Sequence, residues 1–314
     1  MNRSKDRILV VILGQARASK LTWDSFKTNV LDELQGDLAL CIGESPENNL
    51  ENPYWAHAKY RRVLPEYEDF GDGFDQIQTN RIGKINDWRE VLKIKDQWLG
   101  GIKGKEEHPG SAGILVYFKA KLFEFLSSDE IRGLYDRFVI TRSDFIWEMP
   151  HPKIDRLRKD RIWIPYGEFY WGVTDRHVVL TQTFLEPYLN LIDPILRNPK
   201  ELMTEMIRYN PRPNWNHEQY ILFRLKSQNL SSKISWLPYM MFSVREEGAS
   251  TRWSMGVFDS DLGFFVKYPA EKIRTKLTKR FFLNKKKKVI LLPNFLMALI
   301  LKLLFSLKIR NYIS

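Results

Sequence analysis

The stretch "ILVVILGQAR" (8–17) decides the fold class of this 314-residue chain. Its first six residues are all apolar and mostly β-branched, which is typical of a strand covered on both faces. A turn at 14–17 follows at once, with a glycine at its first position. The stretch therefore predicts a buried first strand that ends in a polar turn, the usual start of an α/β domain.

The residues after this turn predict a helix and then a second strand. Apolar side chains recur at spacings of three and four, as on one face of a helix, and Gly36 is a natural stop. The next apolar run, 38–42, predicts another strand. Strand, helix and strand together make a βαβ unit, which builds a mostly parallel sheet flanked by helices. The helical face consists of Trp23, Phe26, Val30 and Leu34.

The rest of the chain continues the alternation of elements. Apolar patterns predict strands at 138–141 and 162–165. The region 44–73 is rich in Pro, Asn, Asp and Gly, so a long loop is expected there. Helical patterns cover 82–98, 114–126, 178–191 and 218–226.

The net charge of +11 is concentrated at the C-terminal end. Residues 272–314 hold 12 of the 49 Lys and Arg and none of the 38 acids, which leaves 37 basic and 38 acidic residues in 1–271. A nucleic-acid-binding protein would carry a basic face on its folded body, so we expect no nucleic-acid partner. One cysteine, Cys41, excludes an intramolecular disulfide and favours a reducing compartment.

A short charged motif follows the predicted strand 138–141. Arg142 and Asp144 stand two apart where the apolar run ends. Ligands of open α/β sheets bind outside the carboxyl ends of strands, where an acid can hold a metal and an arginine can hold a diphosphate. The motif is short, and a surface Arg–Asp pair that closes the strand is the simpler interpretation.

Four segments in this order resemble the GT-A class of nucleotide-sugar glycosyltransferases, and more closely the type found in bacterial lipopolysaccharide and capsule biosynthesis. They are "ILVVILGQAR" (8–17), "VITRSDFIW" (139–147), "IPYGEFYWGVTDRH" (164–177) and "NWNHEQYILFRL" (214–225). The resemblance covers about 7–271. It implies a GT-A-like, Rossmann-like α/β fold and a nucleotide-sugar donor.

The resemblance also implies roles for the two turns. Gly14, Gln15 and Arg17 would lie under the nucleotide, where backbone N–H groups suit phosphate. Residues 142–144 would replace the Asp-x-Asp motif that holds a divalent metal on the sugar diphosphate. The first acid is missing, so two interpretations are open: Asp144 ligates Mg²⁺ or Mn²⁺, or Arg142 takes the place of the metal.

The segment 166–177 is rich in aromatic residues and glycine. Its rings can stack on a base or on a sugar, and the residues after it, Arg176 or His177, would point toward phosphate or acceptor. The alternative interpretation of this group is structural, with Asp175 as the N-cap of a following helix.

The segment around Glu218 carries the candidate general base. Transfer with inversion needs a group that takes the proton of the acceptor hydroxyl, and we expect Glu218 first and His217 second. The alternative is a helix start, with Asn216 as N-cap and Glu218 favoured by the helix dipole. Both interpretations can hold together.

The tail 272–314 differs from the body. A lysine block at 285–288 precedes a nearly all-apolar stretch that is interrupted by Pro293, Asn294 and Lys302. The remaining helix would be about 24 Å long, short of the roughly 30 Å core of a bilayer. We expect an amphipathic helix in the membrane interface, with 285–310 on anionic lipid. A short span and a buried core helix are the alternatives.

These observations predict a glycosyltransferase domain, 1–271, and a membrane-associating tail, 272–314. The protein would be cytoplasmic and peripheral on the inner face of a membrane, and would transfer sugar to a surface glycan or lipid-linked acceptor. A non-catalytic scaffold that binds glycan or nucleotide is the alternative function, favoured by the missing acid. A third hypothesis is a basic-tailed adaptor without nucleotide affinity.

Overall fold

A computed structural model describes residues 6–83, 87–104, 108–212, 215–249 and 255–283, and also 299, 300, 302 and 303. Its centre is a seven-stranded sheet in the order β3-β2-β1-β4-β7-β6-β8. All neighbouring strands are parallel except the two pairs that β7 makes. The predicted α/β class with a mostly parallel sheet is confirmed. The strands are β1 (Ile8–Gly14), β2 (Asp37–Gly43), β3 (Tyr60–Leu64), β4 (Arg137–Thr141), β6 (Ile162–Pro165), β7 (Val178–Leu180) and β8 (Ile234–Leu237).

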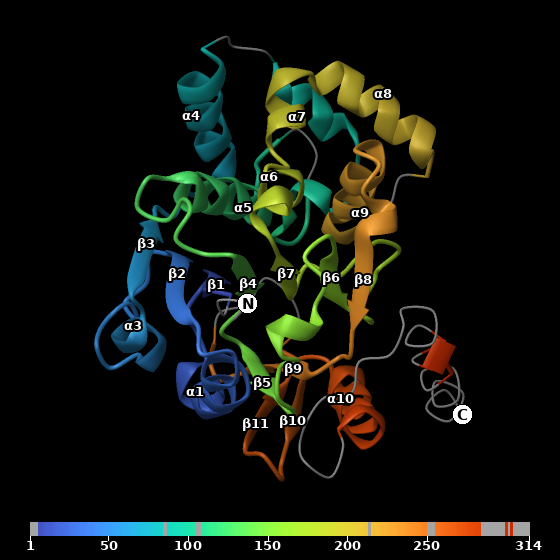
Figure 1. The fold of residues 1–314 in the computed structure, drawn as a ribbon. Helices are drawn as coiled ribbons and strands as arrows, with labels where there is room; N and C mark the ends of the chain where they lie inside the picture. Colours follow the sequence, from blue (N-terminus) through green and yellow to red (C-terminus); the bar gives the residue numbers. More distant parts are fainter. Residues whose placement is uncertain are drawn as a thin grey trace, which may run out of the picture.

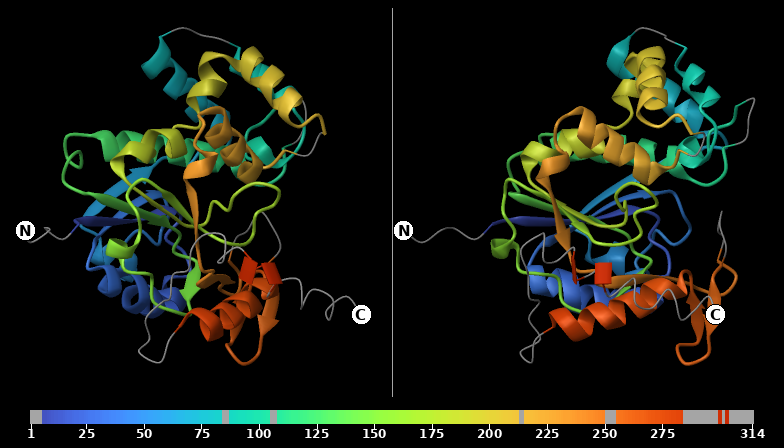
Figure 2. Two further views of the ribbon diagram at one scale, coloured as in Figure 1. Left: turned by 45° about the vertical axis from the view of Figure 1, so that its right-hand side comes forward. Right: turned by 90° about the vertical axis from the view of Figure 1, so that its right-hand side faces the viewer.

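Helices cover one face of this sheet, and a mixed layer covers the other (Figures 1 and 2). The helical face holds α4 (Phe70–Ile82), α5 (Ala112–Ser127), α6 (Gln182–Leu189), α7 (Asp193–Arg197), α8 (Pro199–Tyr209) and α9 (His217–Ser227). The opposite layer holds α1 (Ser19–Phe26), α10 (Pro269–Phe282) and an antiparallel four-stranded sheet. That sheet has the order β10 (Val257–Asp259), β11 (Phe264–Val266), β9 (Met241–Arg245) and β5 (Phe145–Trp147). Two shorter helices are α2 (Asp32–Leu34) and α3 (Pro53–His57).

The strand β1 joins the two hydrophobic cores. Successive side chains of a strand point to opposite faces, so Leu9 and Val11 enter the core under α5 while Val10 and Ile12 enter the core with α1. All four are fully buried. A strand buried on both faces needs the continuous apolar run that the sequence has here.

The chain changes sheets between β4 and β5. It leaves the large sheet at Thr141 and enters the small sheet at Phe145. Because β4 runs parallel to β1, with Ile12 opposite Thr141, residues 142–144 lie beside the turn 14–17. This crossing brings the two predicted turns together at the carboxyl edge of the sheet.

Three predicted elements differ from the structure. The expected loop 44–73 contains α3, β3 and the start of α4. The sequence does not predict β3 because it is a polar edge strand with Arg61 and Arg62 exposed. The expected helix 82–98 is wrong: α4 ends at Ile82, and the 3-10 segment Trp88–Lys93 follows. The expected helix 178–191 is two elements, β7 and α6. The sequence pattern does not separate them, because three apolar strand residues are also compatible with a helix.

The predicted division at 271/272 falls inside α10. The buried face of this helix runs on to Phe282, which packs in the core with α1. The predicted membrane-associating segment 285–310 lies outside the described residues, apart from 299, 300, 302 and 303. Within the described part of the chain, no helix is long and apolar enough to cross a membrane.

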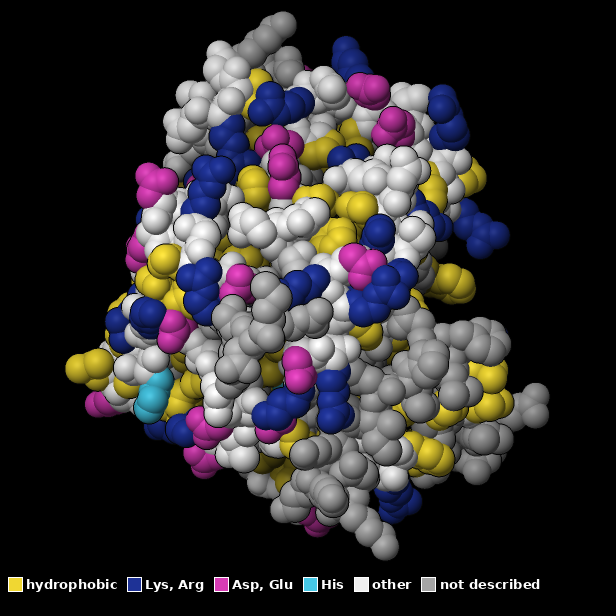
Figure 3. Space-filling model, in the orientation of Figure 1, with side chains coloured by type: hydrophobic (Ala, Val, Ile, Leu, Met, Phe, Trp, Pro, Cys, Tyr) yellow, Lys and Arg dark blue, Asp and Glu magenta, His cyan; other side chains and the backbone are white. Residues whose placement is uncertain are grey.

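The visible surface carries both charges. On the face drawn in Figure 3, Lys and Arg side chains are interspersed with Asp and Glu. This agrees with the balanced charge of residues 1–271.

Candidate functional site

A pocket of about 660 Å³ opens at the carboxyl edge of the large sheet. The ends of β1, β4 and β9 line it, together with the first residues of α5 and α9 and the residues just before α10. Of the predicted site residues, the structure brings together Gly14, Gln15, Arg17, Arg142, Asp144, Arg176, His217 and Glu218.

His177 does not line this pocket. It is fully buried, its Nε2 lies 3.2 Å from Nε2 of His151, and its ring packs edge-on against Trp147. Burial and the neighbouring His151 hold the pKa of His177 well below its usual value. His177 is therefore a neutral residue of the core. It points away from the pocket because consecutive side chains near a strand point to opposite faces, and Arg176 takes the pocket side.

The turn 14–17 is held in place from two sides. Oγ of Ser143 lies 2.6 Å from the carbonyl oxygen of Gln15 and 2.9 Å from that of Arg17. Asn52 donates to the carbonyl oxygen of Ala16 at 2.7 Å. Gly14 has φ +113°, a region that favours glycine. The middle residue of the motif 142–144 thus fixes the first turn, while its neighbours face the pocket.

Asp144 is surrounded by three guanidinium groups. Arg142 donates to both of its oxygens, at 3.1 and 2.8 Å. Nη1 of Arg245 lies 2.5 Å and Nη2 of Arg17 3.5 Å from the same carboxylate oxygen, Oδ2. Burial opposes ionisation, but the three arginines together hold the pKa of Asp144 well below its usual range. The carboxylate is therefore ionised, and the cluster keeps an excess of positive charge.

One wall of the pocket, which we call the cationic wall, is formed by Arg17, Arg142, Arg245 and Lys267. Some of its N–H donors are unused. Arg245 is buried, yet its Nε and Nη2 find no partner among the residues that the structure describes. Burial and the nearby Arg142 and Arg245 lower the pKa of Lys267 to about 7. Buried N–H groups without partners are costly, so an anion that accepts their hydrogen bonds would stabilise this wall.

The wall does not fit a divalent metal. An Mg²⁺ or Mn²⁺ ion needs free carboxylate oxygens, and those of Asp144 accept hydrogen bonds from arginines. The local excess of positive charge repels a cation. In the described ranges, moreover, no group of three or more His, Cys, Asp or Glu side chains is arranged to hold one.

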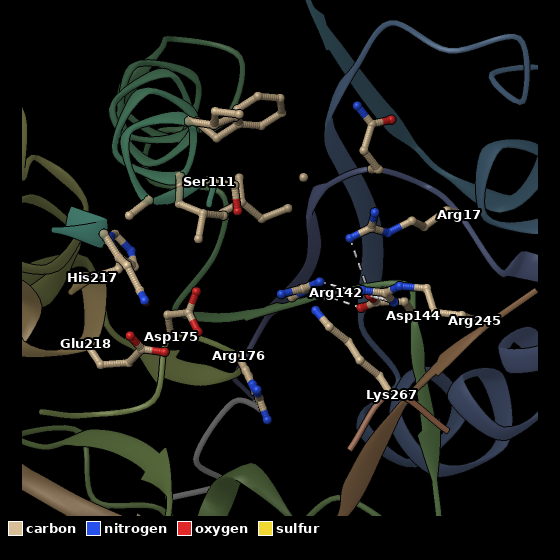
Figure 4. A pocket seen from close by; sticks show the side chains of 18 of the residues that line it. Arg17, Ser111, Arg142, Asp144, Asp175, Arg176, His217, Glu218, Arg245 and Lys267 are labelled. Carbon is tan, nitrogen blue, oxygen red and sulfur yellow. Dashed lines mark hydrogen bonds and ion pairs between the residues drawn. The ribbon is translucent and has the colours of Figure 1, made fainter. Parts of the chain in front are cut away.

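Two carboxylates stand opposite the cationic wall, as Figure 4 shows. They are Asp175, which precedes β7, and Glu218, in the first turn of α9. Burial and the negative charge of Asp175 raise the pKa of Glu218 to about 8. Burial works against ionisation of Asp175 too, but neighbouring cations, Arg142 and Lys119 among them, lower its pKa on balance. At neutral pH, therefore, Asp175 is ionised and Glu218 is mainly protonated.

Two further buried groups back this carboxylate pair. Lys119 of α5 lies 4.5 Å from the ring centroid of Tyr188, and burial lowers its pKa to about 8. Burial and Lys119 lower the pKa of His217 to about 3, so its ring is neutral. The ring nitrogens of His217 and Nζ of Lys119 have no hydrogen-bond partner within the described structure. Lys119 lowers the pKa of Glu218, so its rise to about 8 comes from burial of the carboxyl group and from the charge of Asp175.

Arg176 lies between the two walls and is anchored from α10. It pairs with Glu271, donates to the Tyr239 hydroxyl at 3.0 Å, and lies 3.9 Å from Glu168. Glu271 is fully buried and also accepts from the backbone N–H and hydroxyl of Ser243 at 2.8 Å. The segment "KYPAE" (267–271) thus supplies Lys267 to the wall and Glu271 to Arg176.

Some site residues were not predicted from the sequence. Arg245 and Lys267 line the pocket and the buried Lys119 lies behind it, but none of the three was predicted as a site residue, and only the tertiary structure places them there. Asp175 was considered as an N-cap, but a strand follows it and α6 begins only at Gln182. Asn216 is the N-cap of α9, with the reciprocal hydrogen bonds of a capping box to Gln219, so the helix-start interpretation of this segment is confirmed.

Comparison with known proteins adds a distant structural similarity. No protein-family model and no curated protein sequence matches this chain. Among solved structures, the chain is similar to mouse xyloside xylosyltransferase 1 in its apo form, with a TM-score of 0.39 and 11% sequence identity. The match covers 74% of this chain and 85% of that one. At this level of similarity we base the function on the geometry of the pocket.

Proposed function

We propose that this protein is a GT-A-like glycosyltransferase, which moves a sugar from a nucleotide-sugar donor to a surface glycan or a lipid-linked acceptor. The observation that supports the proposal is the pairing of two unlike walls across one pocket. Arginines around Asp144 suit a diphosphate, and the carboxylate pair opposite suits proton transfer. The resemblance of four sequence segments to the lipopolysaccharide and capsule type favours a surface glycan as acceptor.

The two walls divide the chemistry of a direct displacement. The acceptor oxygen forms a bond to the anomeric carbon while the bond from that carbon to the diphosphate breaks. The nucleoside diphosphate leaves with the electron pair, and Arg17, Arg142 and Arg245 stabilise its charge. Glu218, in its ionised form, takes the proton of the acceptor hydroxyl, and this form becomes the main one as pH rises above about 8. A divalent metal has no part in this scheme, because Asp144 is paired with arginines.

Diphosphate binding is the first test. We would measure the melting temperature and the Kd of the full chain with UDP, GDP, CDP, ADP and dTDP, each in EDTA, Mg²⁺ or Mn²⁺. A ligand that binds only the folded state raises the melting temperature, and we expect one diphosphate to do so in EDTA. Arg245→Gln should weaken this binding at least tenfold. Arg158→Gln is the matched control, because Arg158 pairs with Asp160 on the exposed surface and does not line the pocket.

The outcomes separate the candidate functions. If no diphosphate shifts the melting temperature, the glycosyltransferase proposal fails and an adaptor is favoured. If a diphosphate binds but the corresponding nucleotide sugar is neither transferred nor hydrolysed, the chain is a non-catalytic scaffold. The arginine at the place of the first acid favours that second function, whereas the raised pKa of Glu218 favours catalysis.

A further inference from the structure

The segment 167–172 at the mouth of the pocket has a strained backbone. Glu168, Tyr170 and Trp171 have φ values of +51°, +42° and +70°. None of them is glycine, and left-handed conformations are costly for bulky residues. Such outliers persist only where the surrounding structure enforces them, and they gather at functional sites.

The surrounding structure does enforce this conformation. Glu168 pairs with Arg274 of α10 and accepts a hydrogen bond from the Tyr170 hydroxyl at 2.7 Å. The carbonyl oxygen of Tyr170 accepts from the Asn216 side chain at 2.9 Å. The segment is thus tied both to α10 and to the N-cap of α9.

This rigid segment presents two aromatic rings to solvent. Trp171 is 85% exposed and Tyr170 is 42% exposed, and Tyr170 lines the pocket. An exposed indole on a mobile loop would lose conformational entropy on binding a ligand. An indole held by a strained but fixed backbone is preorganised for a flat partner. Aromatic rings of this kind offer a large apolar face with little entropy to lose on binding.

The backbone that carries the rings lies on the carboxylate side of the pocket. A Cβ on Gly172 would lie 1.9 Å from the carbonyl oxygen of Glu218, so the segment touches the backbone of α9 at the proposed base. The N–H of Val173 donates to the same oxygen at 3.2 Å. The turn that would lie under the nucleotide, Gly14 with Gln15, stands at the end of β1 and leads to Arg17 of the cationic wall.

We infer that Tyr170 and Trp171 form an acceptor subsite that stacks on the apolar face of a sugar ring. The inference rests on the proposed function and deepens it: the acceptor contains a sugar ring, which binds at this subsite next to the hydroxyl group that is glycosylated. A base of the donor nucleotide is the competing occupant, and the contact between the backbone of this segment and that of Glu218 argues against it.

The test uses the full chain labelled with 5-fluorotryptophan and observed by ¹⁹F NMR. The resonance that disappears in Trp171→Phe identifies Trp171. The labelled protein is titrated first with the nucleoside diphosphate that stabilises it, and then with a panel of methyl glycosides of common hexoses, pentoses and deoxyhexoses. We expect the Trp171 resonance to shift with a glycoside and to stay in place with the diphosphate alone.

Variants give the second readout. In Trp171→Ala the apparent Kd of that glycoside should rise roughly three- to tenfold, the range expected for one aromatic contact. Trp171→Phe keeps a ring and should change it less than twofold. Phe258→Ala is the control, because Phe258 is an exposed ring on β10 that does not line the pocket.

The outcomes separate this inference from the proposed function. A Trp171 resonance that shifts with the diphosphate places the base there and overturns the inference, as does a resonance that no glycoside moves while the diphosphate binds. If no nucleoside diphosphate binds at all, the proposed function fails with it.

Discussion

At the scale of single residues, Asp144 is the counter-ion that allows three arginines to be buried together. Its side chain is almost fully buried, and Arg142, Arg17 and Arg245 all approach its Oδ2 atom. Breaking a buried ion pair by removing one partner leaves uncompensated charge. The role of this acid is thus electrostatic balance of the folded site.

We predict that Asp144→Asn destabilises the protein by about 3–5 kcal/mol, measured by urea unfolding. Asp136→Asn is the control, since its ion pair with Arg7 is exposed and should contribute less than about 1 kcal/mol. The variant should bind nucleoside diphosphate in EDTA as tightly as the unchanged protein or more tightly, because the wall becomes more positive. A metal-ligating Asp144 would give the opposite result, a loss of affinity that depends on Mg²⁺ or Mn²⁺.

Glu218 gives a prediction about pH. Its pKa is raised to about 8, so at pH 7 it is mainly protonated and cannot accept a proton. As pH rises through about 8 the carboxylate forms, so kcat at saturating donor should rise and then level off. Glu218→Gln should lower kcat about 10²–10⁴-fold and abolish this rise, with the Kd for diphosphate unchanged. A kcat that falls between pH 7 and 9 would contradict the role of Glu218 as base.

At the scale of elements, the N-terminus of α9 positions the proposed base. Asn216 accepts from the backbone N–H of Gln219 at 2.9 Å, and the Gln219 side chain accepts from the N–H of Asn216 at 3.0 Å. Asn216 also holds Tyr170. The cap therefore joins the helix that carries Glu218 to the aromatic segment.

We predict that Asn216→Ala lowers the free energy of unfolding by about 1 kcal/mol through loss of the cap, and lowers kcat more than it changes the Kd for diphosphate. Asn216→Asp keeps a capping oxygen and should recover the stability, but not the hydrogen bond to Tyr170. Equal losses of stability in both variants would show that the cap contributes little.

The elements also show why the sequence predicted only part of the molecule. Strands β1, β4 and β6 and helix α5 have apolar runs long enough to read, and the meeting of the turns 14–17 and 142–144 follows from adjacent parallel strands. Strand β3 is polar because it is an edge, and β7 is only three residues long. The arginine on β9 reaches Asp144 across 101 residues of sequence, and no local pattern encodes such a contact.

At the scale of the whole molecule, α10 belongs with the folded body. Besides Glu271, it contributes Arg274, which pairs with Glu168, and Lys272, which pairs with Asp259. Figure 2 shows it packed beneath the sheet beside the small sheet. A truncation at the predicted division would therefore remove part of the support of the site.

We predict different results for two truncations. A chain that ends at Leu283 should keep the melting temperature and the diphosphate affinity of the full chain, whereas a chain that ends at Glu271 should lose several degrees, because Phe282 leaves a core. The full chain should co-sediment with phosphatidylcholine vesicles that contain phosphatidylglycerol, and the chain ending at Leu283 should not. Equal co-sedimentation of both would disprove a membrane role for the tail.

The long reach of these ion pairs has a consequence for biosynthesis. A nascent chain that has emerged only as far as β8 already contains β1 and β4, but Asp144 has not met Arg245 and Arg176 has not met Glu271. Domains fold as units, and partly folded ones expose surfaces that other chains can capture. The pocket is thus completed only after β9 and α10 have been translated, so a chain interrupted before α10 would have most of its sheet and an unfinished site.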